Sequence, residues 1–246
     1  MHRWRNPASA ALALFLTILT GLAEQVYPES GEQDETGFVT IFDGESLTGW
    51  EGDPRYWRVE KGCLVGEVKP ENLLERNTFI IWQGGRPGDF ELKLEYQITA
   101  EGNSGINYRS EPVANFPHAL QGYQADIDGG NQYTGQNYEE RGRTFLALRG
   151  DLSRVGRDGK SLVIGSVGEK ARLAASINKD DWNAVHLIVR GNTMIHLVNG
   201  RVMSVLVDDD DTRRRFEGLI GVQVHVGPPM TVRFRNLRLK KLSDDR

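Results

Sequence analysis

The sequence contains one cysteine, Cys63, among its 246 residues. A single cysteine excludes an internal disulfide, so packing alone must hold the fold together. The formal net charge is only −4, and there is no basic stripe, which argues against nucleic acid as a partner. The sequence also lacks a GxSxG elbow, a Walker loop and a cysteine–histidine nucleophile pair. Serine hydrolase, kinase and thiol chemistry are therefore disfavoured.

The N-terminal segment 1–23 resembles a secretory signal, with a basic start and an apolar run over 8–22. That run is short for a membrane-spanning helix, which needs about 20 residues. We therefore predict cleavage after Ala23 and no stable membrane insertion afterwards, with an uncleaved anchor as the alternative. An exported chain without disulfides points to the periplasm or cell surface of a bacterium. Residues 24–37 are polar and acidic and are expected to form a mobile leader before a single domain over 38–242.

The chain after Phe38 is typical of short strands separated by turns rich in glycine and asparagine. Apolar residues alternate with charged ones over 90–98, and Asn199-Gly200 is a two-residue hairpin turn. One short helix is expected within 169–177. The predicted strands cover 38–42, 56–60, 63–67, 78–82, 89–98, 104–109, 122–127, 144–149, 161–165, 183–190, 193–198, 201–207, 218–226 and 231–239. This pattern predicts an all-β fold, a two-sheet antiparallel jelly-roll sandwich with at most one short helix.

Alternation along three strands places polar residues opposite an apolar set. These polar pairs are Asn107 and Arg109, Gln124 and Asp126, and Gln223 and His225. Amide, carboxylate, guanidinium and imidazole groups form hydrogen bonds in fixed directions, which suits a ligand rich in hydroxyls. If the three strands are neighbours, these side chains form the floor of a sugar-binding groove. The alternative is an ordinary solvated sheet face.

Three other polar clusters have alternative explanations. Residues 126–131 place acidic side chains as in a calcium loop, but the full twelve-residue pattern is missing. His186 and His196 lie on neighbouring predicted strands without metal-ligand spacing. A charged cluster of Glu139, Glu140, Arg141 and Arg143 is either a solvated turn or part of the groove rim.

At this level of detail the sequence resembles the 3-keto-disaccharide hydrolase family over about 38–242. The resemblance is carried by Phe42-Asp43-Gly44, Leu47-x-Gly49-Trp50, Trp57-Arg58-Val59, Gly62-x-Leu64, Asp89-Phe90-Glu91-Leu92, Gly102-Asn103-Ser104-Gly105-Ile106-x-Tyr108-Arg109, Gly122-Tyr123-Gln124-Ala125-Asp126, Asp181-Trp182-Asn183, His196-x-x-Asn199-Gly200, Gly221-x-Gln223-x-His225 and Phe234-Arg235-Asn236-Leu237. It implies a concanavalin-like jelly roll that is exported and cleaves glycosides already oxidised to a ketone at sugar carbon 3. This sequence departs from the family at two positions where acidic residues are common, Gln124 and Val224. The resemblance therefore implies that Asp126 supplies the carboxylate that other members have near position 124.

A ketone at carbon 3 makes the proton on carbon 2 acidic, so a base, an oxyanion stabiliser and an acid are sufficient for cleavage. We expect Asp126 or His225 to be the base and Glu139 the reserve acid. The expected sugar-binding residues are Asn103, Asn107, Arg109, Gln124, Arg143 and Gln223. If a divalent metal is present, its expected ligands are Asp126, Glu139 and His225. A carbohydrate-binding module without turnover and a structural cell-surface domain are the alternatives.

Overall fold

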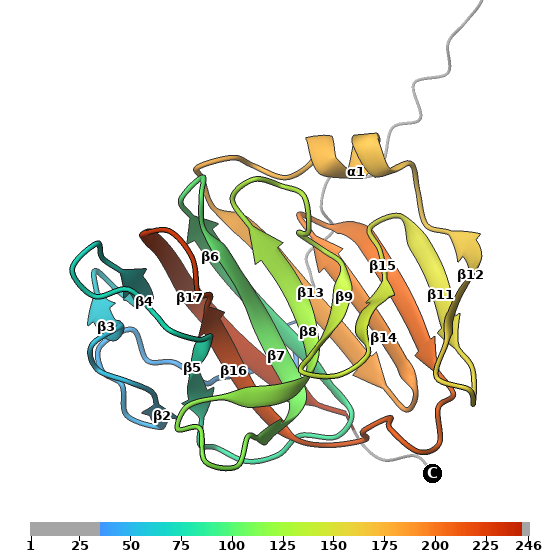
Figure 1. Cartoon of the computed structure of the whole chain (residues 1–246), viewed down its shortest axis with the longest axis horizontal. Helices are drawn as coiled ribbons and strands as arrows, with labels where there is room; N and C mark the ends of the chain where they lie inside the picture. The colour runs from blue at the N-terminus through green and yellow to red at the C-terminus, as the bar shows by residue number, and fades with distance from the viewer. Residues whose placement is uncertain (1–34, 243–246) are drawn as a thin grey trace, which may run out of the picture. The chain divides into compact units, whose positions relative to one another are not determined.

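The computed structural model describes residues 35–242, which form two stacked β-sheets (Figure 1). The predicted signal 1–23 and most of the predicted leader 24–37 lie outside these residues. Sheet A runs in the order β12 (Ser161–Ser166), β11 (Asp151–Val155), β15 (Arg201–Asp208), β14 (Thr193–Val198), β13 (Asn183–Arg190), β6 (Phe90–Ile98), β17 (Met230–Lys241), β4 (Cys63–Val68) and β3 (Trp57–Glu60), and β1 (Val39–Thr40) pairs with β17. Sheet B runs in the order β10 (Thr144–Ala147), β9 (Asn137–Glu140), β8 (Leu120–Asp128), β7 (Asn103–Pro112), β16 (Leu219–Val224), β5 (Thr78–Trp82) and β2 (Trp50–Glu51).

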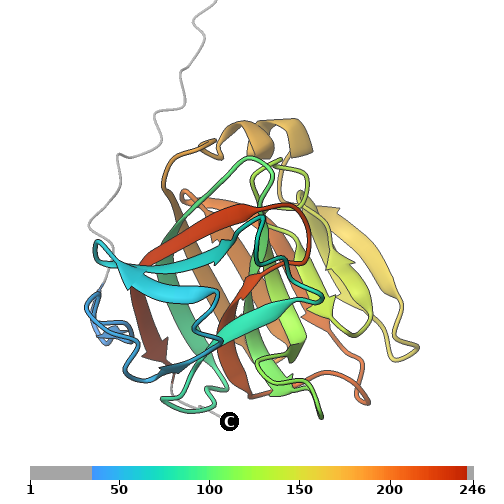
Figure 2. The ribbon, with the colours of Figure 1, turned by 60° about the vertical axis from the view of Figure 1, so that its left-hand side comes forward.

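The strand pairs are antiparallel except for β11 with β15, which is parallel. The one helix of the described chain, α1 (Lys170–Ala175), lies at an end of the sandwich in Figures 1 and 2. The predicted fold class and the predicted short helix are both confirmed. In residues 35–242 no helix has the length and apolar character needed to cross a membrane. Because α1 is at the end, no helix of the described residues covers either outer sheet face.

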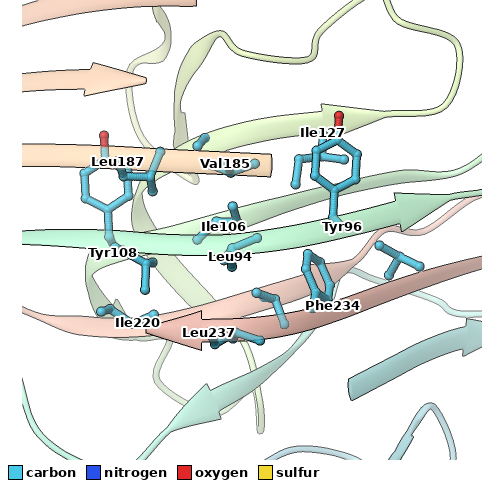
Figure 3. Packing of buried hydrophobic residues seen from close by; sticks show 14 of the residues in the cluster. Leu94, Tyr96, Ile106, Tyr108, Ile127, Val185, Leu187, Ile220, Phe234 and Leu237 are labelled. Atoms are coloured by element: carbon cyan, nitrogen blue, oxygen red, sulfur yellow. The ribbon is translucent and has the colours of Figure 1, made fainter. Parts of the chain in front are cut away.

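The core lies between the sheets and is built by period-two alternation (Figure 3). Leu94 and Tyr96 of sheet A meet Ile106 and Tyr108 of sheet B, and all four are almost completely buried. Burying such side chains stabilises the fold by roughly 1.5–3 kcal/mol each. Inward apolar residues fix the register, so their polar neighbours on β7, β8 and β16 turn to the outer face of sheet B.

The hairpin of β7 and β8 bends sharply near its tip. Its register shifts between Tyr108 and Glu111, and Arg109 has a positive φ of 45°. Gly122 lies opposite this bend with φ 150°, where an added Cβ would lie 2.5 Å from the Ser110 Oγ. The bent tip lies against the outer face of sheet B, where Leu120 packs in a second small apolar cluster with Phe79 and Ile81. This tip closes one end of the outer face.

Candidate active site

A hollow of about 630 Å³ lies on the outer face of sheet B, within the usual size range of small-molecule sites. We call it the sheet B hollow. It is lined by Asn77, Asn103, Gln124, Asp126, Tyr133, Tyr138, Glu140, Arg141, Thr144, Phe145 and His225. The four predicted residues among them, Asn103, Gln124, Asp126 and His225, are brought together from β7, β8 and the end of β16. Regular alternation along β8 is what puts Gln124 and Asp126 on the same face.

Asp126 is the most perturbed group in the sheet B hollow. Its side chain is only 8% exposed, and the Gln124 Nε2 donates a hydrogen bond of 2.7 Å to its Oδ1. Burial raises the pKa of Asp126 to about 8; the Gln124 hydrogen bond lowers it, and the charges of Asp128 and Glu140 raise it further. A carboxylate with this pKa is a much stronger base than an ordinary aspartate and still ionises near neutral pH.

Two side-chain amides, those of Gln223 and Gln124, form a hydrogen-bonded chain that ends at Asp126. Gln223 Nε2 donates to Gln124 Oε1 at 3.1 Å, so Gln124 is fixed by a bond on each side. Gly105 gives Gln124 the space to lie across β7, because an added Cβ would be 2.4 Å from the Gln124 Cδ. Gln223 and Asn107 are fully buried and do not line the hollow. They support the floor of the hollow from the neighbouring strands, a position that differs from the direct sugar contact we predicted.

Arg109 does not lie on this floor, and its predicted place there is wrong. The bend at its positive φ turns the side chain away from the hollow, where it is fully buried. Its guanidinium donates to the carbonyl oxygens of Gly88, Gly191 and Arg215. It also pairs with Asp89 at 2.8 Å. Arg109 therefore ties three loops together at the turn of the hairpin.

Glu139 and Arg143 also lie away from the hollow, contrary to the prediction. Glu139 is opposite Tyr123, whose ring is part of the core, so both face inward. Arg143 pairs with Glu139 and Asp208 at 2.7 Å each and with Asp210 at 3.2 Å. Despite burial, these carboxylates hold the pKa of Arg143 above its ordinary value. The pair belongs to a buried ion cluster that joins sheet B to β15.

Glu140, one residue further along β9, faces the hollow instead. Its Oε1 accepts a hydrogen bond of 3.2 Å from the Asn77 Nδ2. Glu140 belongs to the charged cluster predicted from the sequence, but the acid role was predicted for Glu139, because 137–140 was not recognised as a strand. Alternation along β9 against β8 puts Glu139 and Glu140 on opposite faces. With Glu139 on the inner side, the predicted metal ligands Asp126, Glu139 and His225 do not converge. Over residues 35–242 no three histidine, cysteine, aspartate or glutamate side chains are grouped as metal ligands.

The segment after β8 does not form a calcium loop, because hydrogen-bond donors of the protein itself occupy the Asp128 carboxylate. The Asp128 carboxylate accepts hydrogen bonds from the backbone N–H groups of Gln132, Tyr133 and Thr134. The Thr134 hydroxyl also donates to it at 2.9 Å. Asn131 instead donates to the Ala174 carbonyl oxygen. These bonds fix the loop that carries Tyr133 to the wall of the hollow.

Three aromatic rings form one wall of the hollow. Tyr133 and Phe145 are stacked with centroids 6.1 Å apart and planes at 20°. Tyr138 meets Phe145 edge-on at 5.2 Å. Tyr133 and Phe145 remain 38% and 44% exposed, a large exposure for such rings. An exposed ring face beside amides and a carboxylate suits the apolar face and the hydroxyls of one sugar ring.

Comparison with known proteins also indicates a link to carbohydrates. The model of the 3-keto-alpha-glucoside-1,2-lyase-like domain matches residues 37–240. A 3-keto-disaccharide hydrolase of Bacteroides thetaiotaomicron is 32% identical over a stretch that covers 32% of this chain and 30% of that protein. The match therefore spans less than a third of that relative's length.

Solved structures share the fold at low sequence identity. A candidate glycosyl hydrolase of Parabacteroides distasonis has a TM-score of 0.55 and 20% identity, covering 84% of this chain and 94% of that one. The carbohydrate-binding module CBM66 of Bacillus subtilis has a TM-score of 0.51 and 16% identity, covering 78% and 95%. These structures establish the sandwich architecture of the chain.

Proposed function

Because the chain belongs to the 3-keto-alpha-glucoside-1,2-lyase-like family, we propose that it cleaves glycosides whose sugar carries a ketone at carbon 3. The observation that carries this proposal is the buried Asp126 on the floor of a hollow with an aromatic wall. Its raised pKa matches the task of removing a carbon-bound proton. The relative from Bacteroides thetaiotaomicron is named a 3-keto-disaccharide hydrolase, which supports the same substrate class.

The reaction divides into elimination and hydration. Asp126 takes the proton from carbon 2, and the electron pair of that C–H bond forms an enolate with the ketone at carbon 3. The enolate then expels the glycosidic oxygen from carbon 1, and this oxygen takes a proton from Glu140 and leaves as the free alcohol. Water adds across the resulting C1=C2 bond: its hydroxyl bonds to carbon 1, its proton goes to the Glu140 carboxylate, and Asp126 gives its proton back to carbon 2. The sum is hydrolysis, and Asp126 is returned to its ionised form when it gives up the proton.

Asn103 is the group we assign to the developing enolate oxygen, and His225, whose Nδ1–H donates to the Val226 carbonyl oxygen, lies beside it. They come from adjacent chain segments, because the His225 backbone N–H donates to the Asn103 carbonyl oxygen at 3.3 Å. A hydrogen-bond donor placed where charge develops typically contributes 10²–10³-fold in rate. Phe145 and Tyr133 hold the sugar ring by its apolar face, and Gln124 holds Asp126 in place.

Glu140 takes the acid role that the sequence analysis gave to Glu139. Glu140→Gln is expected to slow release of a sugar or alkyl leaving group by about 10²-fold, since such alkoxides need a proton. Release of 4-nitrophenolate, which leaves without a proton, is expected to change much less. The measurement is kcat/KM for both substrates with wild type and variant. Equal losses on the two leaving groups would remove Glu140 from this role.

The rate on a 3-keto-glycoside is expected to rise with pH through about 8, because Asp126 must be ionised to act as the base. Gly105→Ala is expected to move that midpoint upward, since the new Cβ displaces Gln124 from Asp126 and removes the hydrogen bond that favours the charged form. Gln124→Leu removes the same bond directly and is the matched comparison. A pH–rate profile checks both variants; an unchanged midpoint in both would contradict the role given to Gln124.

Turnover of a 3-keto-glucoside by the purified protein tests the proposed function. Release of the aglycone is the expected result. Absence of release together with measurable binding of the parent sugar would favour a carbohydrate-binding module, the alternative that the aromatic wall supports equally well.

Export to the periplasm or cell surface of a bacterium remains part of the proposal and rests on the segment 1–23. N-terminal sequencing of the protein recovered outside the cytoplasm is expected to begin at residue 24. Recovery of the intact N-terminus from the cytoplasm would contradict it.

A further inference from the structure

A second hollow adjoins the sheet B hollow at Asn77. It has a volume of about 330 Å³, at the small end of small-molecule sites. We call it the side hollow. Its walls are the segment 53–56, the segment 72–78 that leads into β5, and Pro117 and His118 from the bent hairpin tip. Asn77 lines both hollows, so the two hollows are neighbours on the surface.

The junction between the two hollows is held rigidly. Asn77 Nδ2 donates to Glu140, and Asn77 Oδ1 accepts from the Val226 N–H at 2.9 Å. Beside it the Phe116 ring has the Arg76 guanidinium 4.8 Å and the Arg141 guanidinium 5.7 Å from its centroid. Arg76 belongs to the side hollow and Arg141 to the sheet B hollow. The two hollows therefore share the Asn77 side chain, and one arginine from each hollow contacts the same Phe116 ring.

The side hollow has the chemistry of a neutral ligand rich in hydroxyl groups. The Tyr56 hydroxyl donates to Asn72 Oδ1 at 3.1 Å, and both residues line the side hollow. The charges are balanced locally, since Arg55 pairs with Asp53 and Arg76 lies 3.7 Å from Glu75. Balanced pairs give no strong preference for a charged ligand. Amide, guanidinium and carboxylate groups bind hydroxyls in fixed directions.

We propose that the side hollow binds the second sugar ring of a disaccharide substrate, the ring that leaves when the glycosidic bond breaks. This inference rests on the proposed function. It places the 3-keto ring over Asp126 and the neutral leaving sugar past Asn77, with Glu140 at the junction beside the bond between them. The enzyme then prefers disaccharides to simple alkyl glycosides.

The test compares two substrates that share the oxidised ring: a 3-keto-glucosyl-glucose disaccharide and methyl 3-keto-glucoside. The variants are Asn72→Ala and the more exposed Arg76→Ala, with Arg154→Ala, at a different hollow near β11, as the matched control. For Asn72→Ala and Arg76→Ala, kcat/KM on the disaccharide is expected to fall about five- to tenfold, the effect of one lost hydrogen bond. Their kcat/KM on the methyl glycoside and all values for Arg154→Ala are expected to stay unchanged.

The outcomes separate this inference from the proposed function. Turnover of both substrates with no selective loss in the two variants overturns the side hollow as a sugar site and leaves the proposed function intact. Equal losses on both substrates also overturn it. If the wild type turns over neither substrate, the proposed function fails. The side hollow is then tested by calorimetric binding of the unoxidised disaccharide and of methyl glucoside. A selective five- to tenfold loss of disaccharide affinity in both variants supports the side hollow; equal affinities overturn it.

Discussion

Asp126→Asn is expected to lower kcat on a 3-keto-glycoside by about 10³-fold or more without unfolding the protein. The amide has nearly the same shape and can still bond to Gln124, but it cannot accept the carbon-bound proton. Loss of a positioned base typically costs 10²–10⁴-fold, and the raised pKa places Asp126 in the upper part of that range. Steady-state kinetics at pH 9, where the wild-type carboxyl is ionised, measures the effect.

The same variant has a matching stability signature. The carboxyl has a pKa of about 8 in the folded protein against an ordinary value of 3.8, so the folded state binds this proton more tightly. Stability from this group is therefore fully present below pH 4 and is lost as the pH rises toward 8. Asparagine has no such dependence, so Asp126→Asn is expected to be more stable than wild type at pH 9, by up to roughly 5 kcal/mol. A variant that keeps activity, or that is no more stable at pH 9, would contradict the account of Asp126.

Arg143→Met is expected to destabilise the protein by about 3–5 kcal/mol, because it leaves the buried carboxylates of Glu139 and Asp208 without their cation. Asp210 keeps its ion pair with Arg213. For a domain of this size the melting temperature should fall by roughly 10 °C. Thermal unfolding followed by circular dichroism measures this.

Arg141→Met is the matched control for Arg143→Met. Arg141 lies two positions away, is partly exposed, and makes only weak contacts, with Glu140 at 4.0 Å and with the Phe116 ring at 5.7 Å. Its replacement is expected to change stability by about 0.5 kcal/mol or less. If the two variants melted together near the wild-type temperature, the buried ion cluster would not be a structural element, and Arg143 would be available for the sugar-binding role that the sequence suggested.

The architecture could be predicted because its signals are local. Alternation over 90–98, the Asn199-Gly200 turn and the short helix near 170–175 each depend on neighbouring residues, and the structure contains all three. The apolar positions of the last strand change from even (232 and 234) to odd (237 and 239), which predicts a bulge near Asn236. The structure has a register shift between Arg235 and Arg238 and a positive φ at Asn236. Local chemistry of this kind does not depend on how the sheets are stacked.

The site could be predicted only where the strands stay regular. Gln124 and Asp126 reach the hollow because β8 alternates without interruption there. Arg109 was misplaced because the bend at the hairpin turns its side chain, and no single strand shows that bend in its sequence. Glu139 and Glu140 lie on opposite faces of β9, but this strand has only four residues and little apolar pattern, so the sequence does not predict which of them faces the hollow. The aromatic wall from Tyr133, Tyr138 and Phe145 depends on contacts between β9, β10 and a loop, which residue patterns do not reveal.

The most direct test of the account compares aglycone release from a 3-keto-glucoside with release from the same glucoside without the ketone, using wild type and Asp126→Asn. The account predicts release only from the oxidised substrate and only by the wild type, because only a ketone at carbon 3 makes the carbon 2 proton acidic enough for Asp126. Equal release by Asp126→Asn, or release from the unoxidised glucoside, would contradict it.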